Sequence, residues 1–384
     1  MMGSMMRRGS FGDGATLSLD FTTGTLDPLL TFTRSSSGTY LGADGLVKTA
    51  GTNVARFDYD TSGTPLGLLI EASATNLLAH TERLDEAQVS TEQYWITTYS
   101  LTGATAATPG PDGVSNSATQ FAPIAGNGTC IASAAMGTSA QRSFSFYAKQ
   151  SSGTTNLEYT LNNGTTWVAV TTTSSWQRFT IAATTAAQRV GFRFAANNVY
   201  EIWGCQLEAG SGSSSYIKNV SAAGGATRSA DFCDCSSTSF SSWFTQGPGT
   251  ILVHARRFRQ GFSDFASVCT SSGDPRIAVR ANGLAVQIYG NSAGTIANVT
   301  TANTYSLNTN FKTAAVFKQN DYAVVLNGGT VATYTTAGGY PTALNRLTIG
   351  QEAEGAGFML NGWISLLKYW PVRLSNSQIQ EMTT

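Results

Sequence analysis

The chain is poor in charge and in long apolar stretches. Only 12% of its 384 residues are charged, and 23 basic residues balance 23 acidic ones. A chain with no net charge exerts no long-range attraction on polyanions, so nucleic acid is not predicted as a partner. No window of about 18 apolar residues occurs, and no apolar stretch follows the arginines of MMGSMMRRGSFGDG. Neither membrane insertion nor a signal peptide is therefore predicted.

Motifs of known catalytic chemistry are also missing. The sequence contains no G-x-x-x-x-G-K and no H-E-x-x-H pattern. The only histidines are His80 and His254, and His254 lies in a strand-like stretch beside Arg256, an unsuitable setting for a general base. We therefore predict that the protein is not an enzyme.

Cysteine is scarce and irregularly placed. Five cysteines, an odd number at no regular spacing, do not indicate a disulfide framework. Cys233 and Cys235 form a close pair, but neither histidine lies near a second pair that would complete a zinc site. We predict free thiols, no metal and no cofactor.

Turn residues and period-two alternation are abundant instead. With 40 glycines and many Ser and Thr residues, the composition is typical of β proteins. In SFSFYAK, Phe144, Phe146 and Ala148 alternate with polar residues, which predicts a half-buried strand. RVGFRFA shows the same pattern, and tight turns are predicted at Pro111-Asp112-Gly113 and Asn163-Gly164. Residues 76–231 are thus predicted to form a two-sheet jelly roll.

Residues 232–384 predict a second β domain. Hairpins are expected around Asn282-Gly283 and Asn327-Gly328. The chain then ends in a strand and a short helix, for which Ser375 is the predicted N-cap and Gln378 completes a capping box.

The stretch from Thr31 to Leu78 has turn signals but too few apolar residues for a core of its own. Its buried run, Gly67 to Ile70, must pack against neighbouring domains or chains. We predict an all-β protein with four parts: a flexible N-terminus (1–14), an extended leader (15–75), a jelly roll (76–231) and a β-sandwich (232–384).

Three stretches of sequence resemble parts of tailed-phage virion proteins. The leader contains FTR, T-Y, D-G-L-V, R-F-D-Y-D and L-L-I-E-x-x-x-T-N-L-L, which resembles a leader of such proteins. W-G-x-Q-L-E-x-G at 203–210, followed by S-Y-I and T-R-x-A-D, resembles the close of carbohydrate-binding-module-like jelly rolls in phage fibres. The C-terminal strand and helix resemble the concanavalin A or laminin-G-like sandwich.

These resemblances imply a fibre, spike or decoration protein on the exterior of a phage particle, made in the host cytoplasm. The implied partners are other virion proteins, host surface polysaccharide and further copies of the chain, as a homotrimer. Candidate residues that pin the leader are Arg34, Arg56, Asp58 and Asp60.

Aromatic side chains are the predicted sugar contacts, because pyranose C–H faces stack on their rings. The candidates are Trp167, Tyr289 and Tyr340, with His254 as a polar contact. Trp95, Trp203 and Trp363 match framework positions of the resembled families and are assigned to cores.

Two other functions remain open. One is a purely structural capsid or tail protein without glycan recognition. The other is a polysaccharide depolymerase that uses Glu352 and Glu354, which would lie on one face of a strand. The depolymerase is the weaker hypothesis, since concanavalin-like hydrolases resemble E-x-D-x-x-E and Ala353 separates this pair.

Overall fold

The computed structural model describes residues 14–85, 95–98, 105–124, 126–132, 141–183, 189–220, 225–292, 294–335, 340–352 and 357–384. Contacts divide the chain into two compact units. Unit 1 contains Met1–Thr33, Pro65–Glu71 and Phe232–Thr384, and unit 2 contains Arg34–Thr64 and Ala72–Asp231. The predicted leader is therefore divided between the units, while all but the last residue of the predicted flexible N-terminus lies outside the described residues.

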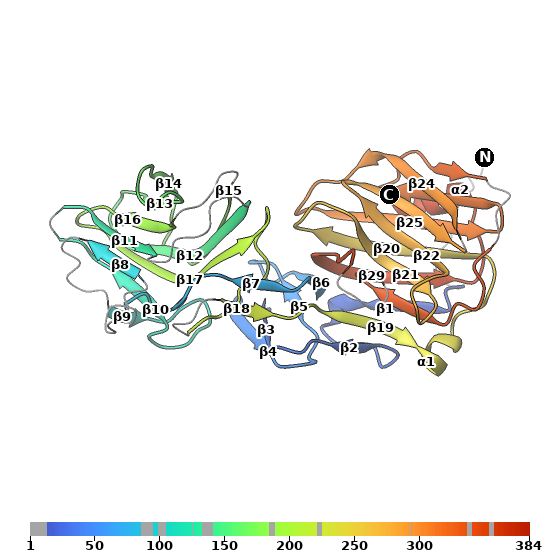
Figure 1. Ribbon diagram of the computed structural model, residues 1–384, viewed down its shortest axis with the longest axis horizontal. Coiled ribbons are helices and arrows are strands. Elements are labelled where there is room, and N and C mark those ends of the chain that lie inside the picture. Colours follow the sequence, from blue (N-terminus) through green and yellow to red (C-terminus); the bar gives the residue numbers. More distant parts are fainter. Residues whose placement is uncertain are drawn as a thin grey trace, which may run out of the picture. The chain divides into compact units, whose positions relative to one another are not determined.

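Unit 1 is a β-sandwich. In its first sheet, β1 (Leu17–Asp20) pairs with β29 (Gly362–Trp370), so a strand from each end of the sequence lies side by side (Figure 1). Within unit 1, the other strands of this sheet follow the order β27-β26-β25-β20-β29-β6. Their bounds are β27 Ala332–Tyr334, β26 Asp321–Leu326, β25 Asn310–Lys318, β20 Gly249–Arg257 and β6 Pro65–Ile70.

The buried run of β6 explains a glycine. Leu68, Leu69 and Ile70 are buried, as the sequence predicted. Gly67 has φ of 107°, and a Cβ there would lie 2.2 Å from the carbonyl oxygen of Ile364. Only glycine lets β6 approach β29 this closely.

The second sheet of unit 1 has the order β2-β19-β28-β21-β22-β23-β24. Its strands are antiparallel neighbours, and β22 and β23 form the predicted hairpin around Asn282-Gly283. The bounds are β2 Thr31–Thr33, β19 Phe232–Ser236, β28 Arg346–Ile349, β21 Ser263–Cys269, β22 Arg276–Asn282, β23 Ala285–Asn291 and β24 Thr295–Thr304.

Three short helices complete unit 1. They are the 3₁₀ helix η1 (Phe21–Thr23), α1 (Ser237–Ser241) and α2 (Asn376–Met382). Helix α2 has the predicted capping box of Ser375 and Gln378, and its Ile379 packs into a core with Leu252 of β20. The hairpin at Asn327-Gly328 is also confirmed.

Unit 2 is a second sandwich, the predicted jelly roll. One sheet has the order β15-β12-β17-β10-β9 and the other β14-β13-β16-β11-β8. The first sheet contains β15 Gln177–Ala183, β12 Arg142–Ser152, β17 Val199–Ala209, β10 Ala118–Phe121 and β9 Thr105–Thr108. The second contains β14 Val168–Val170, β13 Leu157–Thr160, β16 Gly191–Phe194, β11 Gly128–Ala132 and β8 Trp95–Thr98.

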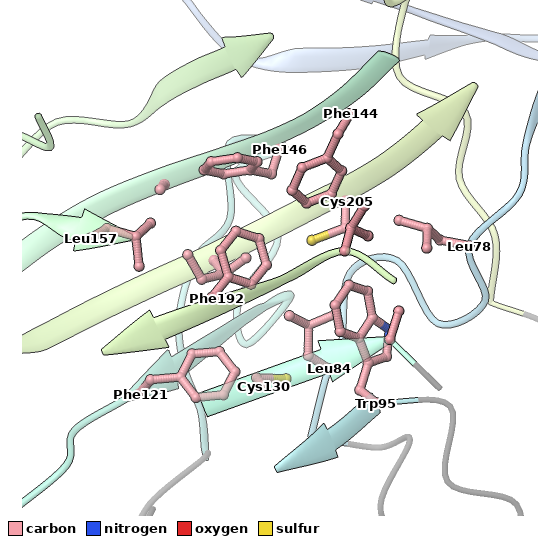
Figure 2. Close-up of a cluster of buried hydrophobic side chains, with 14 of the residues drawn as sticks. Leu78, Leu84, Trp95, Phe121, Cys130, Phe144, Phe146, Leu157, Phe192 and Cys205 are labelled. Carbon is pink, nitrogen blue, oxygen red and sulfur yellow. The ribbon is translucent and has the colours of Figure 1, made fainter. Parts of the chain in front are cut away.

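Aromatic rings fill the space between these two sheets (Figure 2). Phe146 of β12 meets Phe192 of β16 edge to face, with ring centroids 4.8 Å apart. Phe144 and Phe146 are buried as predicted, but the alternate residues Ser143 and Ser145 are buried as well. Strand β12 is thus covered on both faces, more fully than a half-buried strand.

Residues 34–64 pack within unit 2 as three short strands. Strands β3 (Gly38–Leu41) and β4 (Val47–Ala50) pair with each other, and β5 is Phe57–Tyr59. Strand β7 (Ala74–Asn76) pairs with β18 (Ala226–Arg228), which joins the two ends of the jelly-roll segment.

The cysteines and two of the tryptophans considered in the sequence are buried in the cores. All five cysteines are free and buried. Trp95 and Trp203 are core residues as predicted, whereas Trp363 is only partly buried, beneath the Arg256 guanidinium. Within the described residues, no helix combines the length and apolar character needed to cross a membrane.

Candidate ligand-binding site

Strands β21, β22 and β23 bring a group of charged and aromatic side chains together. We call Asp264, Arg276, Arg280, Tyr289 and Glu352 the arginine–tyrosine cluster. Arg276 and Arg280 are four residues apart on β22, so they share one face of the sheet. A bulge between Asp264 and Ala266 places Asp264 opposite Arg280 in the neighbouring strand.

Tyr289 supports both arginines. The Arg280 guanidinium carbon lies 3.8 Å from the centre of the Tyr289 ring, and that of Arg276 lies 5.1 Å from it. The negative face of the ring attracts the guanidinium cations. Tyr289, which the sequence analysis proposed as a sugar contact, therefore forms cation–π contacts with both arginines.

Asp264 is the unusual member of the cluster. It is 0% exposed, and neither of its carboxyl oxygens accepts a hydrogen bond from any residue that the structure describes. Burial raises the pKa of Asp264 to about 7, although Arg276 and Arg280 act to lower it. Glu352 and Asp274 add a smaller raising effect.

The two arginines differ in how many of their donors are used. Arg276 donates a hydrogen bond to the Glu352 carboxylate, and its Nε lies 3.4 Å from Oδ1 of Asp274. Arg280 donates from Nε to Gln287 at 2.7 Å, and its two Nη atoms donate to none of the described residues. Arg280 therefore keeps a fork of donors that matches a carboxylate.

The cluster is buried at its centre and accessible at its edge. Arg280 is 8% exposed, whereas Phe262 is 50% exposed and its ring lies 5.7 Å from the Arg280 guanidinium. Phe262 also meets Phe358, with ring centroids 6.0 Å apart. The edge of the cluster thus offers aromatic surface beside cationic donors.

The predicted acidic pair is only partly placed. Glu352 joins the cluster through its hydrogen bond from Arg276. Glu354 lies outside the described residues, so the spacing of the two carboxyl groups is not on view. The contacts of Glu352 are those of an ion-pair partner.

His254 lies elsewhere, beside a pocket of about 370 Å³ over β20 and β25. Its ring atom Nε2 is buried without a hydrogen-bond partner in the described part of the chain. Burial, together with the positive charges of Lys312 and Lys368, lowers the pKa of His254 to about 4. His254 is consequently neutral at physiological pH.

Trp167 and Tyr340 have local partners. The Arg193 guanidinium lies 5.0 Å above the Trp167 ring and donates two hydrogen bonds to Glu158, at 2.5 and 2.8 Å. The Tyr340 hydroxyl donates to the carbonyl of Gly247. The four predicted sugar contacts therefore lie in four separate environments, and Trp167 belongs to unit 2.

The predicted pinning residues all belong to unit 2. Arg34 and Arg56 donate to the buried carboxylate of Asp231, at 3.1 and 2.5 Å. Asp58 accepts from the backbone of Leu41 at 2.6 Å, which ties β5 to β3. Asp60 accepts from Ser62 and Thr64 within its own turn.

Arg276, Arg280 and Asp264 were missed by the sequence analysis. The first two were visible in RIAVRANG, where arginines four apart on a strand must share a face. Asp264 carries no such signal, because its position opposite Arg280 depends on the bulge. Among the described residues, no group of three potential metal ligands occurs.

No family model and no curated protein matches this chain. Solved structures similar to part of it include IT-sialidase CBM40 from Ruminococcus gnavus bound to alpha2,3 sialyllactose, with 14% identity and a TM-score of 0.32 over 36% of this chain and 82% of that one. Another is a heptameric SAP-like pentraxin from Limulus polyphemus, with 19% identity and a TM-score of 0.29 over 36% of this chain and 70% of that one. A third is NanB sialidase from Streptococcus pneumoniae, with 12% identity and a TM-score of 0.33 over 38% of this chain and 26% of that one. Similarity at this level assigns no ligand to this chain.

Proposed function

We propose that the protein is a carbohydrate-binding structural protein whose arginine–tyrosine cluster binds an acidic glycan. The observation that carries this proposal is the incomplete hydrogen bonding of the cluster. Asp264 is buried with both carboxyl oxygens unpaired, and Arg280 keeps its Nη donors, within the described residues. Unpaired polar groups cost free energy in the folded state, and a ligand carboxylate supplies the partners that the Arg280 Nη donors lack.

Each residue has a role in this proposal. The Arg280 fork binds the sugar carboxylate through paired hydrogen bonds. The partly exposed Tyr289 and Phe262 rings contact the apolar face of the sugar. Asp264 has no exposed surface, so it acts on the ligand through Arg276 and Arg280, whose positive charges it partly balances when ionised.

Binding without bond cleavage is part of the proposal. Glu352 accepts a hydrogen bond from Arg276, and this contact favours neither of the two roles that a carboxyl group has in glycoside hydrolysis, general acid or nucleophile. A depolymerase would release reducing ends from host polysaccharide, and Glu352→Gln would abolish that release. We expect no reducing ends from the native chain at high protein concentration, and their release would contradict the binding role.

We further propose that this binding attaches a phage particle to its host, with the chain on the particle exterior as a homotrimer mounted on other virion proteins. The sequence resemblances of the leader and of the jelly-roll close support this placement. Mass spectrometry of purified particles from a strain that encodes the chain tests it. Absence of the chain from such particles would contradict the placement while leaving glycan binding intact.

The test of binding uses the full chain on a glycan array, followed by calorimetry with the strongest ligand. Arg280→Met is expected to weaken binding of acidic glycans at least about tenfold, the equivalent of one good charged hydrogen bond. Arg346→Met is the matched control, since the Arg346 guanidinium also lies over an aromatic ring, 5.4 Å from the centre of Phe232, and donates to Asp234 at 2.8 Å. Equal affinity of the Arg280 variant and the native chain, or binding to no acidic glycan, would overturn the proposal.

A further inference from the structure

A second site lies in the same sandwich, on the sheet that contains β20 and β25. The pocket beside His254 has a volume of about 370 Å³, within the usual range for small-molecule sites. The residues that line it include His254, Asn310, Phe311, Lys312, Ser365 and Thr384. We propose that this pocket binds an anionic sugar, a single ring that carries a carboxylate or a phosphate.

Strand pairing and hydrogen bonds position the residues that line the pocket. His254 and Lys312 are direct partners in the β20–β25 ladder, so both side chains project from the same face. Asn327 fixes the strand beneath them, because its side-chain oxygen accepts from the Lys312 backbone at 2.8 Å. Ser365 is passed over at the bulge that interrupts pairing of β29 with β20; it lines the pocket, and its hydroxyl donates to the His254 carbonyl oxygen at 3.4 Å.

The charge of the pocket selects the ligand. No acidic side chain of the described chain lines it, and its negative group is the terminal carboxylate of Thr384. Lys312 lines the pocket and Lys368 is close enough to affect His254, so positive charge is in excess. The Lys312 ammonium donates one hydrogen bond, to an oxygen of the Thr384 carboxylate at 2.6 Å, and has three donors in all. Two donors remain for an anion.

His254 and the amides select a sugar over a bare anion. A neutral imidazole offers one N–H donor and one acceptor, and its buried Nε2 has no partner among the described residues. Asn310 and Ser365 add hydroxyl-compatible groups, and Phe311 adds apolar surface. A small inorganic ion would fill only a fraction of the volume and would leave these groups unpaired.

The chain offers a clean reporter for this site, because it contains only two histidines. The test is NMR of the histidine rings in the full-length protein, with His80→Gln to assign the two signals. The probes are glucuronate, glucose 6-phosphate, neutral glucose and inorganic phosphate, each up to about 10 mM to cover weak binding. Glucuronate and glucose 6-phosphate separate the two possible anionic groups.

We expect at least one anionic sugar to shift the His254 signal and to raise its pKa, because a bound anion stabilises the imidazolium. Lys312→Gln and, separately, Ser365→Ala should weaken that binding at least about tenfold and threefold, respectively. Lys318→Gln is the control, as this lysine is exposed at the end of the same strand and does not line the pocket.

Three outcomes would overturn the inference. They are no shift with any probe, equal shifts with neutral glucose and the anionic sugars, or binding of inorganic phosphate as tight as that of either sugar. Because Arg280→Met leaves this pocket intact, the variant should retain the His254 shift. The second site and the proposed glycan binding at the arginine–tyrosine cluster can thus fail independently.

Discussion

Two buried aspartates, one in each unit, are each accompanied by two arginines, yet their surroundings differ. Asp231 accepts hydrogen bonds from Arg34 and Arg56, at 3.1 and 2.5 Å. Asp264 is equally buried, and no described residue donates to its carboxyl group. A buried carboxylate in contact with both guanidinium groups repays its desolvation, whereas an uncontacted one does not.

This difference in hydrogen bonding distinguishes a structural aspartate from one in a candidate binding site. Arg34 also donates to the carbonyl oxygens of Gly51 and Val54, at 2.8 and 3.1 Å, so this arginine organises the backbone around it. Arg280 has no comparable set of backbone acceptors among the described residues. We read the paired carboxylate of Asp231 as structural and the unpaired one of Asp264 as part of a ligand site.

The largest expected effect is that of Asp231→Asn. Removing this charge leaves two buried guanidinium groups without their anion, which should cost roughly 3–5 kcal/mol of the free energy of unfolding. Denaturant unfolding measures the loss, and hydrogen exchange followed by mass spectrometry shows whether peptides of unit 2 carry it. Asp60→Asn is the control, because Asp60 accepts from Ser62 and Thr64 within its turn and an amide oxygen can replace the carboxylate there. A loss below about 1 kcal/mol, typical of an ordinary surface change, would contradict the framework role.

Asp264→Asn should have the opposite sign at neutral and alkaline pH. The pKa of Asp264 in the folded state is about 7, above its ordinary value of 3.8, so the folded state binds the proton more tightly. Its contribution to stability is therefore fully present below pH 3.8 and is lost as the pH rises through about 7. The slope in that window is about 1.4 kcal/mol per pH unit.

The asparagine variant lacks this titration, so the difference in unfolding free energy between it and the native chain should change by about 2–3 kcal/mol between pH 5 and pH 9, in favour of the variant at high pH. Denaturant unfolding across this range measures it. A difference that stays constant with pH would show that Asp264 is ionised in the folded state throughout, and would remove the contrast with Asp231.

Sequence reasoning found the features that local chemistry determines. The turns at Asn163-Gly164 and Asn327-Gly328 place both residues at positive φ, where Asn and Gly are favoured. The capping box of Ser375 and Gln378 is equally local, since both partners lie within one helical turn. Alternating stretches such as SFSFYAK likewise identified strands of an all-β fold.

Features that depend on distant residues were not accessible in the same way. The partners Arg34 and Asp231 are 197 residues apart, and the local sequence around either residue does not predict the pairing. The leader was recognised as lacking a core, but its division between units depends on β6 pairing with β29 and on β3 pairing with β4. The cluster around Asp264 requires the bulge in β21, which tertiary packing decides.

The smallest expected effect concerns an ion pair with good geometry and little burial. Arg193 and Glu158 face each other across β16 and β13 and form two hydrogen bonds, at 2.5 and 2.8 Å. Their side chains are 33% and 29% exposed, so water screens the charges that burial would otherwise strengthen. Glu158→Gln should therefore cost less than about 1 kcal/mol, and a double-mutant cycle with Arg193→Met should give a coupling energy in the same range.

This pair tests whether burial or paired hydrogen bonding makes the Asp231 contacts stabilising and distinguishes Asp231 from Asp264. Like Asp231, Glu158 accepts two guanidinium hydrogen bonds, but both come from one arginine and the pair is more exposed. A coupling energy of about 3 kcal/mol would mean that paired hydrogen bonds alone create a strong framework contact. In that case the missing bonds of Asp264, and not its burial, would be the property that marks a ligand site, and its burial would lose its value as a criterion.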